Sequence, residues 1–253
     1  MTSLSLDKTK SIGQVIYIVE GDRTEHELIE RIYSLLGYSV IAYNKFCRSC
    51  TCLQGRNKYS KVFVIPAAHS AIAKLSDDAD YFDEVYRFLA IDYGLDVENS
   101  AIFYLFDRDR RSNRPRQIKP VLEKYGSSRS SVGYEMNGLF LLSYPSIEAY
   151  LSTANGDDLE LGAGESAKRY VEERNYCIGD VCEKEILLAA SSMVSTIESI
   201  SKTRFCTESL DDFTETNKRI LSFQDDKWAR DHRYATLSLL SASLIDLGII
   251  SMD

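Results

Sequence analysis

The stretch from residue 14 to residue 22, QVIYIVEGD, decides the fold that this sequence predicts. Its first six residues are mostly β-branched or aromatic, which is typical of a short strand, and its last three form a turn signal. Thr24 then offers an N-cap, and apolar residues recur at helical spacing from Leu28 to Leu36 before Gly37 ends the helix. The segment therefore predicts a strand, a turn and a helix in succession.

Three further hydrophobic runs repeat the strand pattern, at residues 61–66 (KVFVIP), 101–106 (AIFYLF) and 138–142 (GLFLL). Helical patterns lie between or after them, around residues 81–93, at 116–125 and from Ile147 onward. The run at 101–106 is hydrophobic without interruption, as expected for a strand covered on both faces. Strands that alternate with helices predict an α/β fold with a parallel sheet and right-handed crossovers.

The second part of the chain has a different character. Residues 155–165 (NGDDLELGAGE) are rich in glycine and acidic residues, and the hydrophobic period beyond them is helical. We therefore expect two domains, an α/β domain at residues 1–155 and a small helical C-terminal domain at 156–253. The apolar faces of these helices predict self-association or docking onto a partner, with packing against the sheet as the alternative.

Composition places the chain in the ordinary globular class. Of 253 residues, 44% are hydrophobic and 27% are charged, which excludes collagen-like and disordered classes. No apolar run approaches the roughly 20 residues that span a bilayer. The first 14 residues are polar and lack the apolar core of a signal peptide. We therefore expect a cytoplasmic protein that does not bind membranes.

One segment is basic although the chain as a whole is acidic. Residues 101–130 contain eight Lys and Arg residues against three Asp and Glu residues, a local net charge of +5 in a chain of net charge −8. Four of the arginines surround a pair of aspartates after the third strand: Arg108, Arg110, Arg111 and Arg114. This pattern indicates a phosphate-bearing ligand, and we expect these arginines to contact nucleic acid.

Carboxylates follow three of the four predicted strands. Glu20 follows the first, Asp107 and Asp109 follow the third, and Glu148 lies a few residues past the fourth. Carboxyl ends of parallel strands meet at one edge, where ligands bind. Clustered carboxylates repel one another unless a cation neutralises them, and hard oxygen ligands suit Mg²⁺ or Mn²⁺. The alternative is that these residues form turns or cap helices.

Other reactive side chains carry weaker signals. Cys47, Cys50 and Cys52 form a tight cluster, but no histidine or second cysteine pair follows at zinc-ribbon spacing, so free thiols are the preferred interpretation over zinc ligands. His69, after the second strand, either contacts phosphate in the same crevice or has a structural role. Trp228 either stacks on a base or, as we prefer, packs a helix.

Three ordered motifs resemble a known family. Residues 18–25 (IVEGDRTE) and 106–109 (FDRD) resemble the two signatures of the TOPRIM fold, which topoisomerases, bacterial primases, small RNA-maturation nucleases and OLD-family nucleases share. With residues 143–148 (SYPSIE), the pattern is similar to RloB-like and related phage-defence TOPRIM proteins. The resemblance covers about the first 155 residues and not the remainder.

The resemblance implies a TOPRIM-like catalytic domain with specific residue roles. Glu20 would act as general acid/base or metal ligand, and Asp107 and Asp109 would bind Mg²⁺ or Mn²⁺. Glu25 and Glu148 would be supporting carboxylates. The alternative is that each stabilises the start of a helix, where a carboxylate interacts favourably with the helix dipole. The chain has no room for a topoisomerase gate domain or the extra regions of a primase, so a nuclease is the expected member.

The predicted function is metal-dependent endonuclease cleavage of RNA or DNA, as the toxic effector of a prokaryotic antiviral defence system. The sequence has no GxxxxGK[ST] phosphate loop, so we expect a separate ATPase sensor to control it. A homodimer is a further expectation. The alternative is a TOPRIM-like binding or regulatory subunit that hydrolyses nothing.

Overall fold

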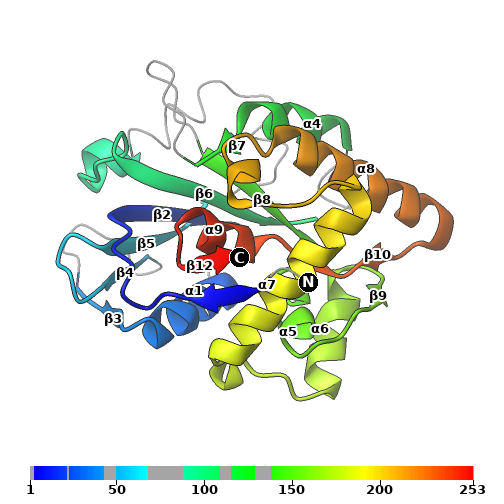
Figure 1. The fold of residues 1–253 in the computed structure, drawn as a ribbon, viewed down its shortest axis with the longest axis horizontal. Helices are drawn as coiled ribbons and strands as arrows, with labels where there is room; N and C mark the ends of the chain where they lie inside the picture. The colour runs from blue at the N-terminus through cyan, green and yellow to red at the C-terminus, as the bar shows by residue number, and fades with distance from the viewer. Residues whose placement is uncertain are drawn as a thin grey trace.

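The computed structural model describes residues 3–21, 23–42, 50–67, 88–108, 115–128 and 138–252. These residues form a mixed α/β fold in which helices flank a central sheet (Figure 1). The strand order across the sheet is β11-β8-β6-β2-β5-β4-β3, and β7 pairs with β8 outside this path. The predicted α/β class is therefore confirmed.

Four parallel strands form the centre of the sheet: β2 (Gln14–Val19), β5 (Lys61–Pro66), β6 (Ser100–Asp107) and β8 (Gly138–Tyr144). All four match the hydrophobic runs of the sequence. From Val15 to Val19 no side chain is more than 3% exposed, so β2 is covered on both faces. Because β2 lies between β5 and β6, the strand order reverses beside it, which is where α/β sheets bind ligands.

Short antiparallel strands complete both sides of the sheet. On one side lie β4 (Thr51–Gln54) and β3 (Ser39–Val40), and on the other β7 (Gly126–Ser127) and β11 (Leu237–Ser238) pair with β8. Strands of two to four residues carry no measurable periodicity, and the sequence analysis missed them.

Helices follow the central strands at the predicted places. They are α1 (Thr24–Leu35), α4 (Pro115–Lys124) and α5 (Ala149–Ala154). Thr24 is the first helical residue rather than the predicted N-cap; Arg23 holds that position without a side-chain capping bond. Of the helix expected around residues 81–93, the described part contains the π-helical turn η1 (Phe88–Asp92), and residues 81–87 lie outside the described residues.

The second part of the chain is helical but also contains strands. Its helices are α6 (Gly164–Glu173), α7 (Glu183–Ser201), α8 (Thr214–Asp231) and α9 (Leu240–Asp246), with short 3-10 turns η2 (Ile178–Asp180) and η3 (Thr207–Leu210). The strands β9 (Glu160–Leu161) and β10 (Tyr234–Ala235) pair with each other, and β12 (Ile250–Met252) pairs with β1 (Leu4–Leu6). The two ends of the chain therefore lie side by side (Figure 1).

The hydrophobic core does not divide at residue 156. β11 extends the central sheet, the Tyr17 and Ser243 hydroxyls are 2.8 Å apart, and the Asn217 side-chain amide donates to the Phe140 carbonyl at 2.8 Å. These contacts are buried, and the core is continuous across the predicted boundary. Helices of this second part share that core: α7 packs on α5, and α9 contacts β8 of the sheet.

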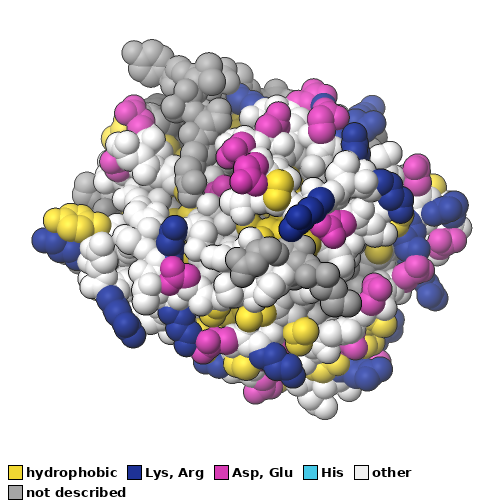
Figure 2. Space-filling model, in the orientation of Figure 1, with side chains coloured by type: hydrophobic (Ala, Val, Ile, Leu, Met, Phe, Trp, Pro, Cys, Tyr) yellow, Lys and Arg dark blue, Asp and Glu magenta, His cyan; other side chains and the backbone are white. Residues whose placement is uncertain are grey.

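On the face drawn in Figure 2, acidic and basic side chains are interspersed. Among the described residues, no helix combines the length and apolar character needed to cross a bilayer.

Candidate active site

Glu20 and Asp107 meet at the carboxyl ends of two adjacent strands. Val19, the last residue of β2, pairs with Leu105 of β6. The Glu20 amide donates to the Leu105 carbonyl at 3.1 Å, and the Asp107 amide donates to Glu20 Oε2 at 2.8 Å. The Glu20 carboxylate therefore bridges the two strand ends, and its position is fixed by the backbone of the second predicted motif.

Asp107 lies among three other acidic side chains. Its Oδ1 accepts a hydrogen bond of 2.8 Å from the Ile147 amide, in the turn that follows β8. Burial raises the pKa of the Asp107 carboxyl well above its usual range, and the charges of Glu25, Glu20 and Glu148 raise it further. The hydrogen bond from Ile147 opposes this shift but does not reverse it. Asp107 thus faces a concentrated negative charge.

Glu25 reaches back from the first turn of α1 to the turn after β2. Its Oε1 accepts the Gly21 amide at 3.0 Å, and the residue is 6% exposed. Burial raises the pKa of this carboxyl and Glu148 adds to the shift, whereas Lys168 lowers it. A Cβ on Gly21 would lie 2.5 Å from Glu25 Oε2, so glycine is needed for the carboxylate to approach the backbone this closely.

Glu148 occupies the N-cap position of α5, but its side chain does not cap the helix. Its Oε2 accepts a 2.7 Å hydrogen bond from the Ser146 hydroxyl, and its Oε1 is 4.0 Å from Lys168 Nζ. The residue is 7% exposed. Capping of α5 therefore does not explain the position of the Glu148 side chain. Its charge instead acts on both Asp107 and Glu25.

The structure thus brings together four of the predicted carboxylates, Glu20, Glu25, Asp107 and Glu148, which we call the carboxylate cluster. Their hard oxygen atoms match the chemistry of a Mg²⁺ or Mn²⁺ site. Within the described residues, however, no three His, Cys, Asp or Glu side chains are placed to hold an ion as they stand. Asp109, a predicted ligand, and His69, a predicted supporting residue, lie outside the described residues.

Arg108 does not have the environment of a nucleic-acid contact. Its side chain is 0% exposed, and its Nη2 donates to Asp225 Oδ1 of α8 at 2.7 Å. Successive side chains at the end of a strand point to opposite faces, so Asp107 and Arg108 diverge. The expectation for Arg108 is corrected accordingly: the guanidinium is enclosed against α8. The other predicted contacts, Arg110, Arg111 and Arg114, lie outside the described residues.

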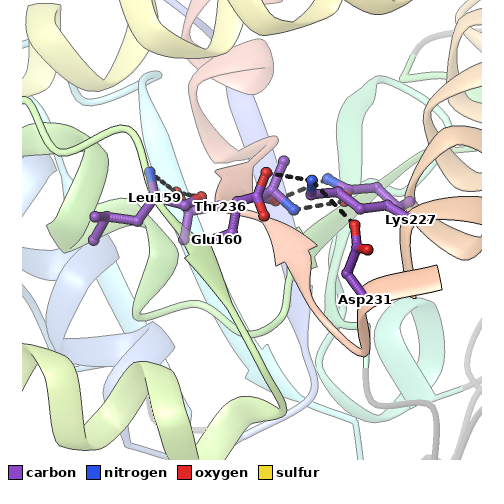
Figure 3. Close-up of polar contacts among 7 residues, drawn as sticks. Leu159, Glu160, Lys227, Asp231 and Thr236 are labelled. Atoms are coloured by element: carbon purple, nitrogen blue, oxygen red, sulfur yellow. Dashed lines mark hydrogen bonds and ion pairs between the residues drawn. The ribbon is translucent and has the colours of Figure 1, made fainter. Parts of the chain in front are cut away.

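Helix α8 is itself anchored by a polar network around Lys227 (Figure 3). The ammonium forms an ion pair with Glu160 of β9 and lies 3.9 Å from Asp231. The Gln224 side chain donates to the Ala235 carbonyl at 2.8 Å and accepts from the Ala235 amide at 3.0 Å. These bonds fix α8 against β9 and β10, and therefore fix the helix that carries the partner of Arg108.

The described cysteines and Trp228 were the other candidate functional side chains. The described cysteines are free thiols: Cys50, Cys52, Cys177, Cys182 and Cys206. Burial raises the pKa of the Cys52 thiol to about 11, and Cys47 lies outside the described residues. Trp228 stacks on Tyr234 with ring centroids 4.7 Å apart, which confirms its packing role.

Sequence reasoning missed three side chains that support the cluster or the turn beside it. Ser146 lies within the third quoted motif, which could have identified it. Lys168 and Asp225 lie on helices of the second part of the chain and carry no local signal, because only the tertiary structure brings them to Glu148 and Arg108.

No family model, curated protein or solved structure matches this chain.

Proposed function

We propose that the chain is a TOPRIM-like nuclease that hydrolyses phosphodiester bonds of RNA or DNA with Mg²⁺ or Mn²⁺. The observation that supports this proposal is the convergence of the carboxylate cluster at the ends of β2, β6 and β8, where the strand order reverses. Four neighbouring carboxylates are costly to keep ionised, and a divalent cation offsets that cost. A metal ion held at this edge of the sheet would support metal-assisted hydrolysis.

Glu20, Asp107 and Asp109 would hold the ion in this proposal. When bound, the cation supplies positive charge to the scissile phosphate and to the attacking water. Glu20 would accept the proton of that water, and its orientation is supported by the bond from the Asp107 amide. Glu25 and Glu148 would support the cluster through their bonds to Gly21 and Ser146.

The basic segment around residues 110–114 would position the substrate. Arg110, Arg111 and Arg114 supply charge for phosphate contacts immediately after the DRD motif. Arg108 would act differently, by holding the end of β6, which carries Asp107, through its bond to Asp225. We further propose the role of defence effector controlled by a separate ATPase, which rests on the motif resemblance and on the lack of a phosphate loop in the sequence.

A second candidate is a TOPRIM-like subunit that binds nucleic acid or a partner without hydrolysis. One observation favours it: within the described part of the chain, no three potential ligands are placed to hold an ion. The two candidates differ in a measurable property, because a scaffold without a metal site has no saturable Mg²⁺ binding that depends on Asp107.

Cleavage assays with the full chain test the nuclease proposal. The protein is incubated with tRNA, single-stranded DNA and duplex DNA, in Mg²⁺, in Mn²⁺ and in EDTA. We expect cleavage of at least one substrate in divalent cation, no cleavage in EDTA and none by Asp107→Asn. Glu98→Gln, an exposed acidic residue before β6, is the matched control and should retain activity. Equal activity of Asp107→Asn and the control would exclude the assigned site.

A further inference from the structure

A basic pocket lies at the opposite end of the sheet from the carboxylate cluster. It has a volume of about 150 Å³ and is formed by three segments: the residues before β2, the end of α1 and the turn between β4 and β5. Its lining residues are Lys8, Thr9, Lys10, Ser11, Leu36, Tyr38, Gly55, Arg56, Asn57 and Ser60. The volume equals that of about five liquid waters, which is room for a phosphate group and some of its hydration.

The lining of this basic pocket carries positive charge only. Lys8, Lys10 and Arg56 contribute to it, and no aspartate or glutamate does, although the chain has a net charge of −8. Lys8 forms a 2.5 Å ion pair with Glu183. Neither Lys10 nor Arg56 has a close ion-pair partner among the described residues, but the nearby Asp7 carboxyl, whose pKa is lowered mainly by its hydrogen bonds from Thr9, also interacts electrostatically with Lys10. The charge of Arg56 is therefore not balanced by an ion pair within the described residues.

Hydroxyl and amide groups continue the polar lining between the cations. The Ser11 and Ser60 hydroxyl oxygens are 3.2 Å apart, and the Asn57 side-chain amide donates to the Ser11 hydroxyl at 3.3 Å. The Ile12 amide donates to the Ser60 hydroxyl at 3.3 Å, and Ser60 is 2% exposed. Hydroxyl protons rotate to suit a ligand, so the Ser11 and Ser60 hydroxyls can donate hydrogen bonds to an anion.

Structural roles explain only part of this charge. The Arg56 guanidinium lies near Gly37, just after α1, where a cation complements the helix dipole. Lys8 is balanced by Glu183. The stem of Lys10 packs near Gly248, with Cε 3.0 Å from where a Cβ on that glycine would be. The Lys10 Nζ lies 3.1 Å from the same point, and its charge is shared between the pocket lining and the nearby Asp7.

We infer that the basic pocket binds a phosphate group, either as inorganic phosphate or as the terminal phosphate of a mononucleotide. Lysine supplies a point charge and arginine a planar fork, and both form strong charge-assisted bonds to phosphate oxygens. The pocket lies by the first residues of β2, whereas Glu20 follows its last. At about 3.3 Å per residue, this separates the two sites by roughly 20 Å. The bound phosphate is therefore distinct from a scissile phosphate at the carboxylate cluster.

Calorimetric titration of the full chain in EDTA tests the inference independently of any metal-dependent activity. The probes are inorganic phosphate, AMP and adenosine. We expect saturable binding of phosphate and of AMP, weakening with added NaCl, and no binding of adenosine. Tighter binding of AMP than of phosphate would identify a nucleotide as the ligand, and equal binding would identify phosphate itself.

Matched variants assign the binding to this pocket. Lys10→Ala and Arg56→Ala should each weaken phosphate binding by about tenfold, the loss expected for one charge-assisted contact. Lys58→Ala removes an exposed positive charge from the same turn but outside the lining, and should bind as the wild type does. Asp107→Asn should also bind normally. Unchanged circular dichroism confirms folding. The inference fails if the wild type shows no saturable phosphate binding, or if Lys58→Ala loses as much affinity as Lys10→Ala.

Discussion

Arg108 and Asp225 form an ion pair of 2.7 Å between positions 117 residues apart in the sequence. Arg108 follows β6 directly, and Asp225 lies on α8. The Arg108 amide also donates to the Ser143 carbonyl at 2.8 Å, so both its backbone and its side chain are held. The end of β6, which carries the predicted metal ligand Asp107, is therefore anchored to a helix in the second part of the chain.

Removal of Asp225 should destabilise the fold. Asp225→Ala leaves the fully buried Arg108 guanidinium without this countercharge, and loss of one partner of a buried pair costs about 3–5 kcal/mol. We expect a loss in unfolding free energy at the lower end of this range, because Asp225 retains 16% side-chain exposure. Denaturant unfolding measures it. The neighbouring exposed Asp226→Ala is the control, and similar losses in both variants would contradict the anchoring role.

Asp107→Asn should stabilise the metal-free protein at neutral pH. Because the folded-state pKa of Asp107 is raised above the unfolded value, its ionisation reduces stability as pH rises through the folded-state pKa. The amide avoids this cost and keeps an oxygen for the Ile147 bond. In EDTA at pH 7 we expect Tm to rise by a few degrees, the shift that about 1 kcal/mol produces in a chain of this size. The gain should disappear near pH 4, and a Tm below that of the wild type at pH 7 would contradict the expected repulsion.

Addition of Mg²⁺ should reverse the order of stability. A cation that binds only the folded wild type stabilises it by about 2.7 kcal/mol at a hundredfold excess over Kd. We expect Tm of the wild type and of Glu98→Gln to rise with Mg²⁺, and Tm of Glu20→Ala and Asp107→Asn to stay constant. Cleavage should be lost in the last two variants without loss of fold. A parallel rise in all four proteins would place the bound Mg²⁺ elsewhere.

Gly21→Ala should displace Glu25 from the carboxylate cluster. The new Cβ would lie 2.5 Å from Glu25 Oε2, which is too close for the carboxylate to keep its bond to the backbone. If Glu25 supports the reaction, nuclease activity should fall about tenfold, the effect of roughly 1.4 kcal/mol on the barrier. Gly179→Ala meets no atom within 4 Å and serves as the control. Equal activities of the two variants would remove Glu25 from the proposed site.

A chain that ends at Ala154 should not fold. It lacks β11, which pairs with β8, and the Ser243 hydroxyl that contacts Tyr17 in the core. We expect an insoluble product, or a soluble one without a cooperative unfolding transition in calorimetry. A folded fragment with a sharp transition would instead restore the two-domain organisation that the sequence predicts.

The sequence predicted the centre of the sheet better than its surroundings. Uninterrupted hydrophobic runs determine β2, β5, β6 and β8, and acidic residues at their ends indicated the carboxylate cluster, because parallel strands end at the same edge.

Tertiary pairing accounts for what the sequence analysis missed. The two residues of β11 have no periodic signal of their own, and the basic pattern around Arg108 predicts a nucleic-acid contact although this side chain is buried. Its environment depends on Asp225, which no local pattern connects to it.

The pairing of β11 with β8 also determines when the core around the central sheet can close during synthesis. The ribosome releases the strands of the central sheet well before residues 237–246, so a nascent chain lacks the strand and the helix that close its core. Arg108, directly after β6, likewise lacks its partner Asp225 until α8 has been synthesised. A proposed toxic activity would thus be withheld from any nascent chain that lacks residues 237–246, and termination before these residues would yield a product that quality-control proteases remove.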